Sequence, residues 1–279
     1  MDKVTLENVL NTDIRTWYDI PLLEGIMTND NIAGRRLLPE EIERRNRLCV
    51  YLDEIQHTND WVREDIELIR NQHKRVVRLT QIGYGKQVKR GTPFSRRSSE
   101  TASSLLYRLF GKDNVLYILK ACDQALPRIA RMWEKTAGLL WAFYDAPLEE
   151  NDARFPEICD SLDDVTELAP LFTNIGVRKN SSGHSYIEEG TIMMSLWRIR
   201  NRVVHKIIGA GDTCIFETMG EHDDYITYTD HYSGRQRKIP ILTLADWITP
   251  VLESYDHFVR NYNAFIGIIE KDLVERGKI

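Results

Sequence analysis

The chain has 279 residues, of which 42% are hydrophobic and 28% charged, and its formal net charge is −5 at pH 7. This length and apolar content suffice to bury a core, so we expect a globular protein. The sequence has no charged-then-apolar leader and no run of the ~20 apolar residues that span a bilayer, so we expect a soluble, cytoplasmic protein without a membrane partner.

Helical patterns dominate the first part of the chain. Pro39 suits the first turn of a helix that we expect to end near Gln56, and a second helix is predicted from Asn59 or Asp60 to about Ile82. Gly83–Ser99 contains glycines, a proline and serines, which indicates a hinge or loop.

The window Leu68–Ser99 holds nine Lys or Arg residues and no Asp or Glu. Two interpretations stay open. The window is either a solvated basic helix end followed by a mobile loop, or a surface that attracts phosphate. The four cysteines lie far apart and form no C-x-x-C pair, so we expect buried free thiols, no metal and no cofactor.

A further helix is predicted from Ser98 or Ser99, with a pause near Gly111 and a restart at Asp113, and it continues to Tyr144. Pro127 is expected to kink or divide it. The acidic segment 145–164 is expected to be a loop with a short helix after residue 161, and residues 178–185 are expected to form a flexible connection.

The next helix should begin at Glu188 or Thr191 and end near Ile208. After Gly211 the pattern changes to short β-branched and aromatic runs, which predict a small antiparallel hairpin or meander. A last long helix is predicted from Thr243 or Leu244 to Val274. The expected fold is therefore mainly α, a helical bundle with a small β-hairpin inserted before the last helix.

The segment "SLWRIRNRVVHKIIG", residues 195–209, places polar side chains on an otherwise apolar helix. Helical spacing forms two neighbouring apolar stripes that cover about half of the circumference, which is more than one packing contact requires. Arg200 falls within the apolar half, whereas Asn201 and His205 share a line on the polar half. Because a guanidinium stays charged, Arg200 needs an anion, a carboxylate or water.

The string Arg200-Asn201-Arg202-Val203-Val204-His205 resembles the R-N-x-x-x-H form of the signature of HEPN-superfamily proteins. Many members of this family are RNases of bacterial defence, toxin–antitoxin and CRISPR systems. The resemblance covers Ser98 to the C-terminus, and it implies an α-helical bundle that dimerises with the motifs facing across a cleft. The chain would then have an N-terminal helical region, 1–97, and a HEPN-like domain, 98–279, unless the two form one continuous domain.

The resemblance also implies a metal-independent endoribonuclease, in which the 2′-hydroxyl of RNA attacks the neighbouring phosphate. Histidine suits proton transfer near neutrality and arginine suits a phosphate clamp, so we assign these roles to His205 and Arg200. Asn201 would orient His205 or the phosphate. Further RNA contacts are predicted at Arg198, Arg202, Lys206, Lys86, Lys89, Arg90, Arg96 and Arg97.

Two rival interpretations remain. The motif could be inert in a module that binds nucleic acid, an antitoxin or another regulatory partner, or it could only specify the homodimer interface of a structural protein. The cluster around "GEHDDY" and His231 contains possible metal ligands, but a solvated hairpin turn explains these residues more simply.

Overall fold

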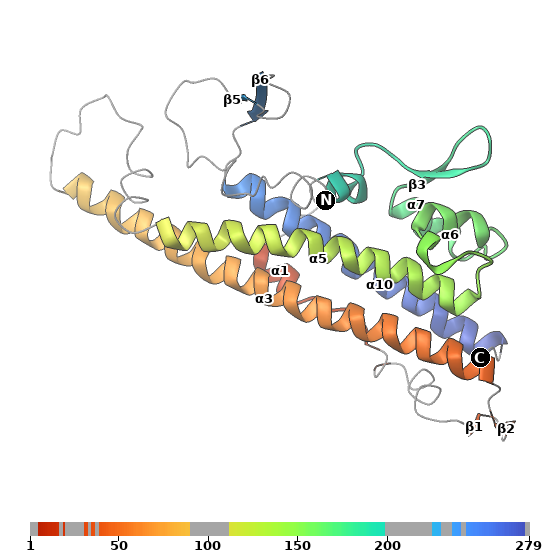
Figure 1. Ribbon diagram of the computed structural model, residues 1–279. Coiled ribbons are helices and arrows are strands. Elements are labelled where there is room, and N and C mark those ends of the chain that lie inside the picture. Colours follow the sequence, from red (N-terminus) through yellow and green to blue (C-terminus); the bar gives the residue numbers. More distant parts are fainter. Residues whose placement is uncertain are drawn as a thin grey trace.

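Three long helices form the body of the molecule in the computed structural model: α3 (Pro39–Lys89), α5 (Lys112–Tyr144) and α10 (Leu244–Arg276). They lie side by side, and α3 runs in the direction opposite to α5 and α10 (Figure 1). The mainly α fold is thus confirmed. The described residues are 5–16, 19, 31–32, 35–36, 39–89, 112–198, 225–229, 236–240 and 244–276. Within them, no helix is both long and apolar enough to cross a membrane.

Shorter elements surround the three helices. The helical ones are α1 (Leu6–Leu10), η3 (Glu150–Asp152), α6 (Phe155–Ser161) and α7 (Ala169–Asn174). The strands form antiparallel pairs: β1 (Asn31–Ile32) with β2 (Arg35–Arg36), β3 (Val177–Lys179) with β4 (Ser185–Ile187), and β5 (Tyr225–Thr229) with β6 (Gln236–Pro240). The β5–β6 pair confirms the hairpin predicted before the last helix. The further strand that a meander would need, near residues 213–218, lies outside the described residues.

The core lies where the three long helices meet. Ile55, Val62, Ile66 and Ile69 of α3 are fully buried, at the spacing of one helix face. They belong to the same hydrophobic cluster as the buried faces of α5 and α10. Residues from both sides of the predicted boundary at 97/98 therefore share one core, while the boundary itself falls outside the described residues.

Trp133 of α5 stands at the centre of this core and is fully buried. Its ring contacts Phe258 of α10 edge-on, with centroids 5.0 Å apart, and Phe155 of α6 edge-on at 5.5 Å. Edge-to-face contacts of this kind stabilise aromatic clusters beyond the apolar area that they bury. The indole thereby joins the bundle to α6, which begins at Phe155.

The two helices predicted on either side of residues 57–58 are one continuous helix, α3, so the predicted break is wrong. The polar run that suggested a break contains Thr58 and Asn59, which are buried rather than exposed at a helix end. The Asn59 side chain accepts a hydrogen bond from the Tyr255 hydroxyl at 2.7 Å and donates one to Asp13 Oδ1 at 3.1 Å. Asn59 therefore links α3 to α10 and to the N-terminal segment, and it does not cap a helix.

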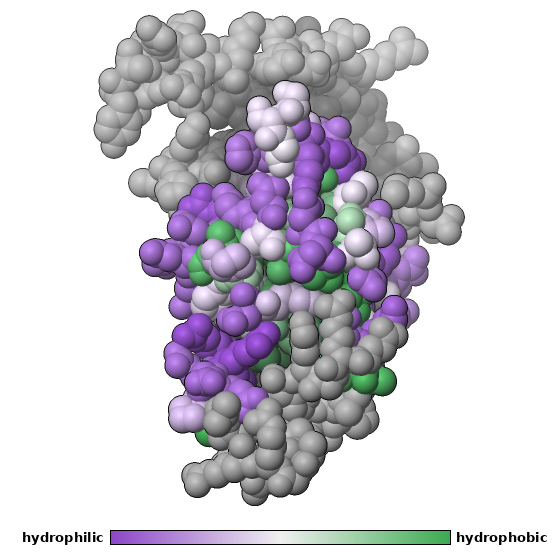
Figure 2. All heavy atoms as spheres, turned by 90° about the vertical axis from the view of Figure 1, so that its right-hand side faces the viewer, coloured by the Kyte–Doolittle hydropathy of each residue, from purple (hydrophilic) through white to green (hydrophobic). Residues whose placement is uncertain are grey.

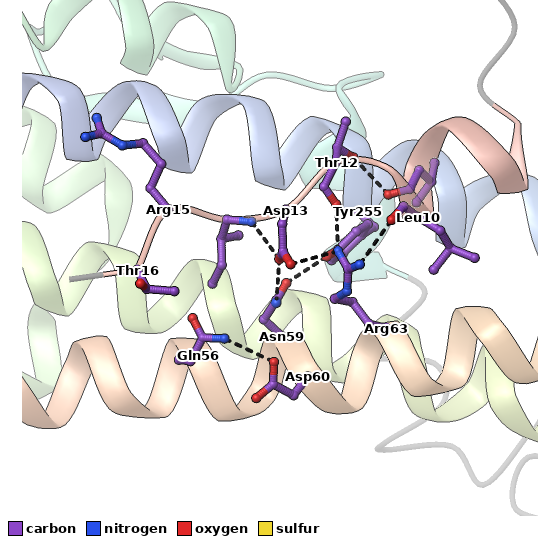
Figure 3. Close-up of polar contacts among 12 residues, drawn as sticks. Leu10, Thr12, Asp13, Arg15, Thr16, Gln56, Asn59, Asp60, Arg63 and Tyr255 are labelled. Atoms are coloured by element: carbon purple, nitrogen blue, oxygen red, sulfur yellow. Dashed lines mark hydrogen bonds and ion pairs between the residues drawn. The ribbon is translucent and has the colours of Figure 1, made fainter. Parts of the chain in front are cut away.

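The same polar contacts hold the N-terminal segment against α3 and α10 (Figure 3). Arg63 donates to the Thr12 carbonyl at 2.7 Å and to the Leu10 carbonyl at 3.0 Å. Asn263 of α10 donates to the Asp13 carbonyl at 2.9 Å, and its Oδ1 accepts the Arg15 N–H at 2.7 Å. The segment from Leu10 to Arg15 is thus fixed through its backbone and through the Asp13 carboxylate, which also forms an ion pair with Arg63 at 3.1 Å.

The loop predicted from Gly83 is wrong as far as Lys89, and of the two outcomes predicted at Pro127, a kink or a division, the division does not occur. The loop predicted from Gly83 is helical as far as Lys89, because a glycine costs a helix only about 1 kcal/mol and each added residue still gains a hydrogen bond. Pro127 does not divide α5. Its neighbours Leu126 and Ile129 are fully buried, and this packing offsets the hydrogen bond that the proline removes.

The segment between α5 and residue 188 is more ordered than predicted. A short helix is expected after Ser161, but α6 lies before it and ends at Ser161. The helix begins at Phe155 because Pro156 suits the first turn, where proline loses no hydrogen bond. The connection expected at 178–185 is a hairpin whose turn is closed by Asn180: its Oδ1 accepts the N–H groups of Ser182 and His184. Gly183 supplies the positive φ, +83°, that this turn requires.

Replacing Asn59 with alanine should lower the free energy of unfolding by about 1–3 kcal/mol, because the buried Tyr255 hydroxyl loses its acceptor. Urea denaturation followed by circular dichroism measures the change. Asn71→Ala is the matched control, since it removes an exposed asparagine from the same helix and should change stability by less than about 0.5 kcal/mol. Equal effects of the two substitutions would contradict the assigned role of Asn59.

His257 gives the fold a pH dependence. Burial lowers its pKa from the ordinary value of 6.5 to about 4, and its ring packs 5.7 Å from that of Trp133. The unfolded chain therefore binds a proton that the folded chain does not, so the contribution of His257 to the free energy of unfolding should fall as pH decreases from about 6.5 to about 4. Burial raises the pKa of Asp65 to about 6, and this carboxyl acts in the opposite direction over the same range. His257→Gln should remove the histidine's decrease, which is measured as the difference from wild type in urea titrations at several pH values.

The matched control is His184→Gln, because His184 lies exposed on the β3–β4 hairpin. This variant should keep the wild-type pH dependence between pH 4 and 6.5. A wild-type profile that persists unchanged in His257→Gln would show that another group causes the decrease.

Candidate functional site

The residues of the predicted catalytic motif are not among those that the structure describes. Arg200, Asn201 and His205, with Arg202 and Lys206, lie outside the described residues. The same holds for Arg90, Arg96 and Arg97 of the basic window, whereas Lys86 and Lys89 lie on the last turns of α3 with side chains that are not described. The described residues therefore do not test whether the predicted site residues lie close together, and a common site for them stays a prediction.

The helix that carries the motif begins as the sequence predicts. Residues 192–198 are helical, and the Thr191 hydroxyl accepts the Met194 N–H at 3.2 Å, which makes Thr191 the N-cap. Met193 and Leu196 are fully buried in the common core. Arg198, predicted to contact RNA, is exposed and forms an ion pair with Glu189. The start of the motif helix is thus anchored in a fixed orientation.

A cavity of about 600 Å³ lies beside this anchored turn. Its walls come from α3, α5, the segment from η3 to α6, and the helical turn 192–198. The lining residues that matter for its chemistry are Tyr51, Lys135, Gly138, Glu150, Arg154 and Trp197. These six residues come from four separate parts of the sequence, and Trp197 is three residues before Arg200.

Tyr51 and Gly138 form the back wall of the cavity. A Cβ atom at position 138 would lie 2.4 Å from Cε1 of Tyr51, so only glycine lets the ring lie this close to α5. The Tyr51 hydroxyl donates a hydrogen bond to Glu150 Oε1 at 2.6 Å, which fixes η3 against α3. Burial, and next the hydrogen bond to Glu150, raise the pKa of the Tyr51 hydroxyl well above its usual range, so it stays protonated and keeps its hydrogen bond to Glu150.

Lys135 completes this wall. Its Nζ lies 5.5 Å from the centre of the Tyr51 ring and forms an ion pair of 2.5 Å with Glu54 Oε2. The ring of Tyr51 therefore lies against Gly138 and near a cation of the same helix, and the cation is paired with a carboxylate. Contacts of this kind pre-organise a binding surface before a ligand arrives.

Other polar groups at the cavity have no partner among the described residues. Arg154 and Asn151 show no side-chain hydrogen bond or ion pair there, and Arg154 is exposed. The indole N–H of Trp197 is buried without an acceptor. A buried unpaired donor is rare in proteins and calls for an explanation. Together these groups offer a cation and N–H donors to a polar ligand.

None of the described lining residues is a histidine or a cysteine, and no group of His, Cys, Asp and Glu in the described parts of the chain has the arrangement of a metal site. The segment around His231, a weaker metal candidate, lies outside these parts. The titratable side chains that line the described walls include Glu134, Lys135 and Glu150.

A second polar cluster lies on the β3–β4 hairpin. The Ser185 hydroxyl donates to Asp160 Oδ1 at 2.6 Å, and His184 Nδ1 is 4.0 Å from Asp160 Oδ2. In a catalytic triad the histidine stands between serine and aspartate. Here the serine bonds the aspartate directly, so the cluster is structural. Figure 2 faces this end of the molecule, where hydrophilic side chains cover most of the described surface.

No family model, no curated protein and no solved structure matches the chain. Sequence reasoning missed the cavity residues other than Trp197, because they lie far apart along the chain. One signal was available: an isolated glycine in a long apolar helix, as at Gly138, often marks a close approach of another group.

Gly138→Ala should displace Tyr51 and break its hydrogen bond to Glu150, lowering the free energy of unfolding by about 1–3 kcal/mol. Gly267→Ala on α10 is the control, because nothing lies within 4 Å of an added Cβ there. That substitution should be neutral or stabilise the protein by up to about 1 kcal/mol. Thermal and urea unfolding measure both, and a stable Gly138→Ala variant would contradict the described wall.

Proposed function

We propose that the chain is a HEPN-like, metal-independent endoribonuclease of a prokaryotic defence or toxin–antitoxin system. One observation supports it most: the motif follows directly on a helical turn whose inner side is buried in the core and whose Trp197 borders a polar cavity. The mainly helical bundle agrees with the family that the motif resembles.

Helical spacing extends this observation to the motif. At ~100° per residue, Arg200, Asn201 and His205 would all stand within ~80° of Trp197 around the axis of the helix predicted to end at Ile208. The three residues would then point to the side of the helix on which the cavity lies. RNA held along this side would pass both the cavity and the motif.

The proposed reaction follows from the residue types. His205 removes the proton of a 2′-hydroxyl, the 2′-oxygen attacks the adjacent phosphorus, and the bond from phosphorus to the 5′-oxygen breaks. Arg200 holds the phosphate oxygens, whose negative charge grows in the transition state. Protonated His205 gives the proton that it took to the leaving 5′-oxygen, directly or through water. The products are a 2′,3′-cyclic phosphate and a 5′-hydroxyl, and we infer that a homodimer places two motif helices across one cleft.

Single-stranded RNA incubated with the purified chain in EDTA should be cut into products with 2′,3′-cyclic phosphate ends. His205→Ala and Arg200→Ala should each lower the rate by about 100-fold or more, because each removes one of the groups that acts in the transition state. His184→Ala and Arg260→Ala are matched controls, since both change exposed residues that do not belong to the motif, and they should stay within about threefold of wild type.

Other outcomes separate the rival functions. Cleavage that needs magnesium and survives both substitutions overturns the proposed mechanism. RNA binding without cleavage supports an inert binding module. No RNA interaction, together with a weaker dimer in Arg200→Ala, supports a purely structural role for the motif.

A further inference from the structure

We propose that the cavity beside Trp197 is a base-binding subsite that selects guanosine in the RNA strand next to the cleaved phosphate. This inference rests on the proposed function, because the motif would cleave the RNA and the cavity would select the base next to the cleaved phosphate. Its basis is the set of described groups around the cavity.

The size of the cavity fits one nucleotide. Its volume of about 600 Å³ falls in the middle of the range of roughly 300–1,000 Å³ that small-molecule sites have. Sequence-specific RNA recognition acts mostly on single-stranded bases, which stack on aromatic side chains and form hydrogen bonds through their edges. Trp197 offers the aromatic surface at the side from which the motif continues.

Arg154 offers the contact for a phosphate. Its guanidinium is exposed at the edge of the cavity and has no partner among the described side chains, whereas other cations near the cavity are already paired, such as Lys135 with Glu54. A planar guanidinium donates two parallel hydrogen bonds to phosphate oxygens. The position of Arg154, immediately before α6, is fixed by the packing of Phe155 against Trp133.

Glu150 offers the contact that distinguishes the bases. Its carboxylate accepts one hydrogen bond, from Tyr51, and a carboxylate has about four acceptor positions. Guanine carries two neighbouring N–H donors, N1–H and the 2-amino group, on its Watson–Crick edge. Uracil has a single N–H between two carbonyl oxygens, which repel a carboxylate. Guanine is therefore the base that suits this wall best.

The cavity wall that carries Glu150 is held in place before a ligand binds, which lets it distinguish guanine from uracil. Tyr51 packs against Gly138 and lies near Lys135, and its hydroxyl bonds Glu150 without a ligand.

Isothermal titration calorimetry with the 3′-monophosphates of guanosine, adenosine, cytidine and uridine tests the subsite without any cleavage. Guanosine monophosphate should bind the full-length chain at least about tenfold more tightly than uridine monophosphate. Glu150→Gln should abolish this preference. Arg154→Gln should weaken the nucleotide at least about tenfold while changing the affinity for guanosine, which lacks the phosphate, much less.

Glu149→Gln and Arg260→Gln are the matched controls, because they remove the same charges from exposed positions that do not line the cavity. Both should bind guanosine monophosphate as wild type does. Thermal unfolding of all four variants should stay within about 5 °C of wild type, which shows that the fold is intact. In RNA cleavage, wild type should cut beside guanosine, and Glu150→Gln should cut without this preference.

The two proposals fail in different ways. RNA cleavage without guanosine preference, or nucleotide binding that Glu150→Gln and Arg154→Gln leave unchanged, overturns the subsite while the nuclease stands. Guanosine-selective binding that both substitutions remove, in a chain that never cleaves RNA, supports base recognition by the cavity and overturns the nuclease.

Discussion

The contact of Trp133 with Phe258 and Phe155 is the interaction on which the described structure depends. A fully buried indole on α5 meets one aromatic ring from α10 and another from the first residue of α6. The neighbouring residue Lys135 faces the cavity from the same helix. The core and the candidate site are therefore two sides of one turn of α5, and a change in core packing would move the walls of the cavity.

Much of this architecture follows from local sequence patterns. The apolar spacing and the helix start signals locate the last helix within a residue or two, and the helix predicted to continue from Asp113 to Tyr144 is described from Lys112 to Tyr144. The predicted pause near Gly111 lies outside the described residues. The pairing of β5 with β6 follows from alternating side chains in two short runs. These features depend on neighbours in the sequence, and a single sequence contains that information.

The errors arise where tertiary contacts override local preference. Asn59 looks like a cap because asparagine competes for backbone hydrogen bonds, yet here its amide is buried between Tyr255 and Asp13. The cavity was not predictable for a related reason. Tyr51, Gly138, Glu150 and Trp197 meet only after three helices have packed, and none of them carries a motif. The sequence predicts that the motif lies on a helix, and the structure describes the part of this helix that precedes the motif, residues 192–198.

The attachment of the N-terminal segment has a consequence for how the chain tolerates change. Arg63 and Asn263 bind main-chain groups of residues 10–15, which do not depend on the type of side chain. Asn11 and Thr12, which are exposed, should therefore accept replacement without detaching the segment. Asp13, the buried Ile14 and Arg15 also hold the segment through their side chains, so changes there should weaken the attachment.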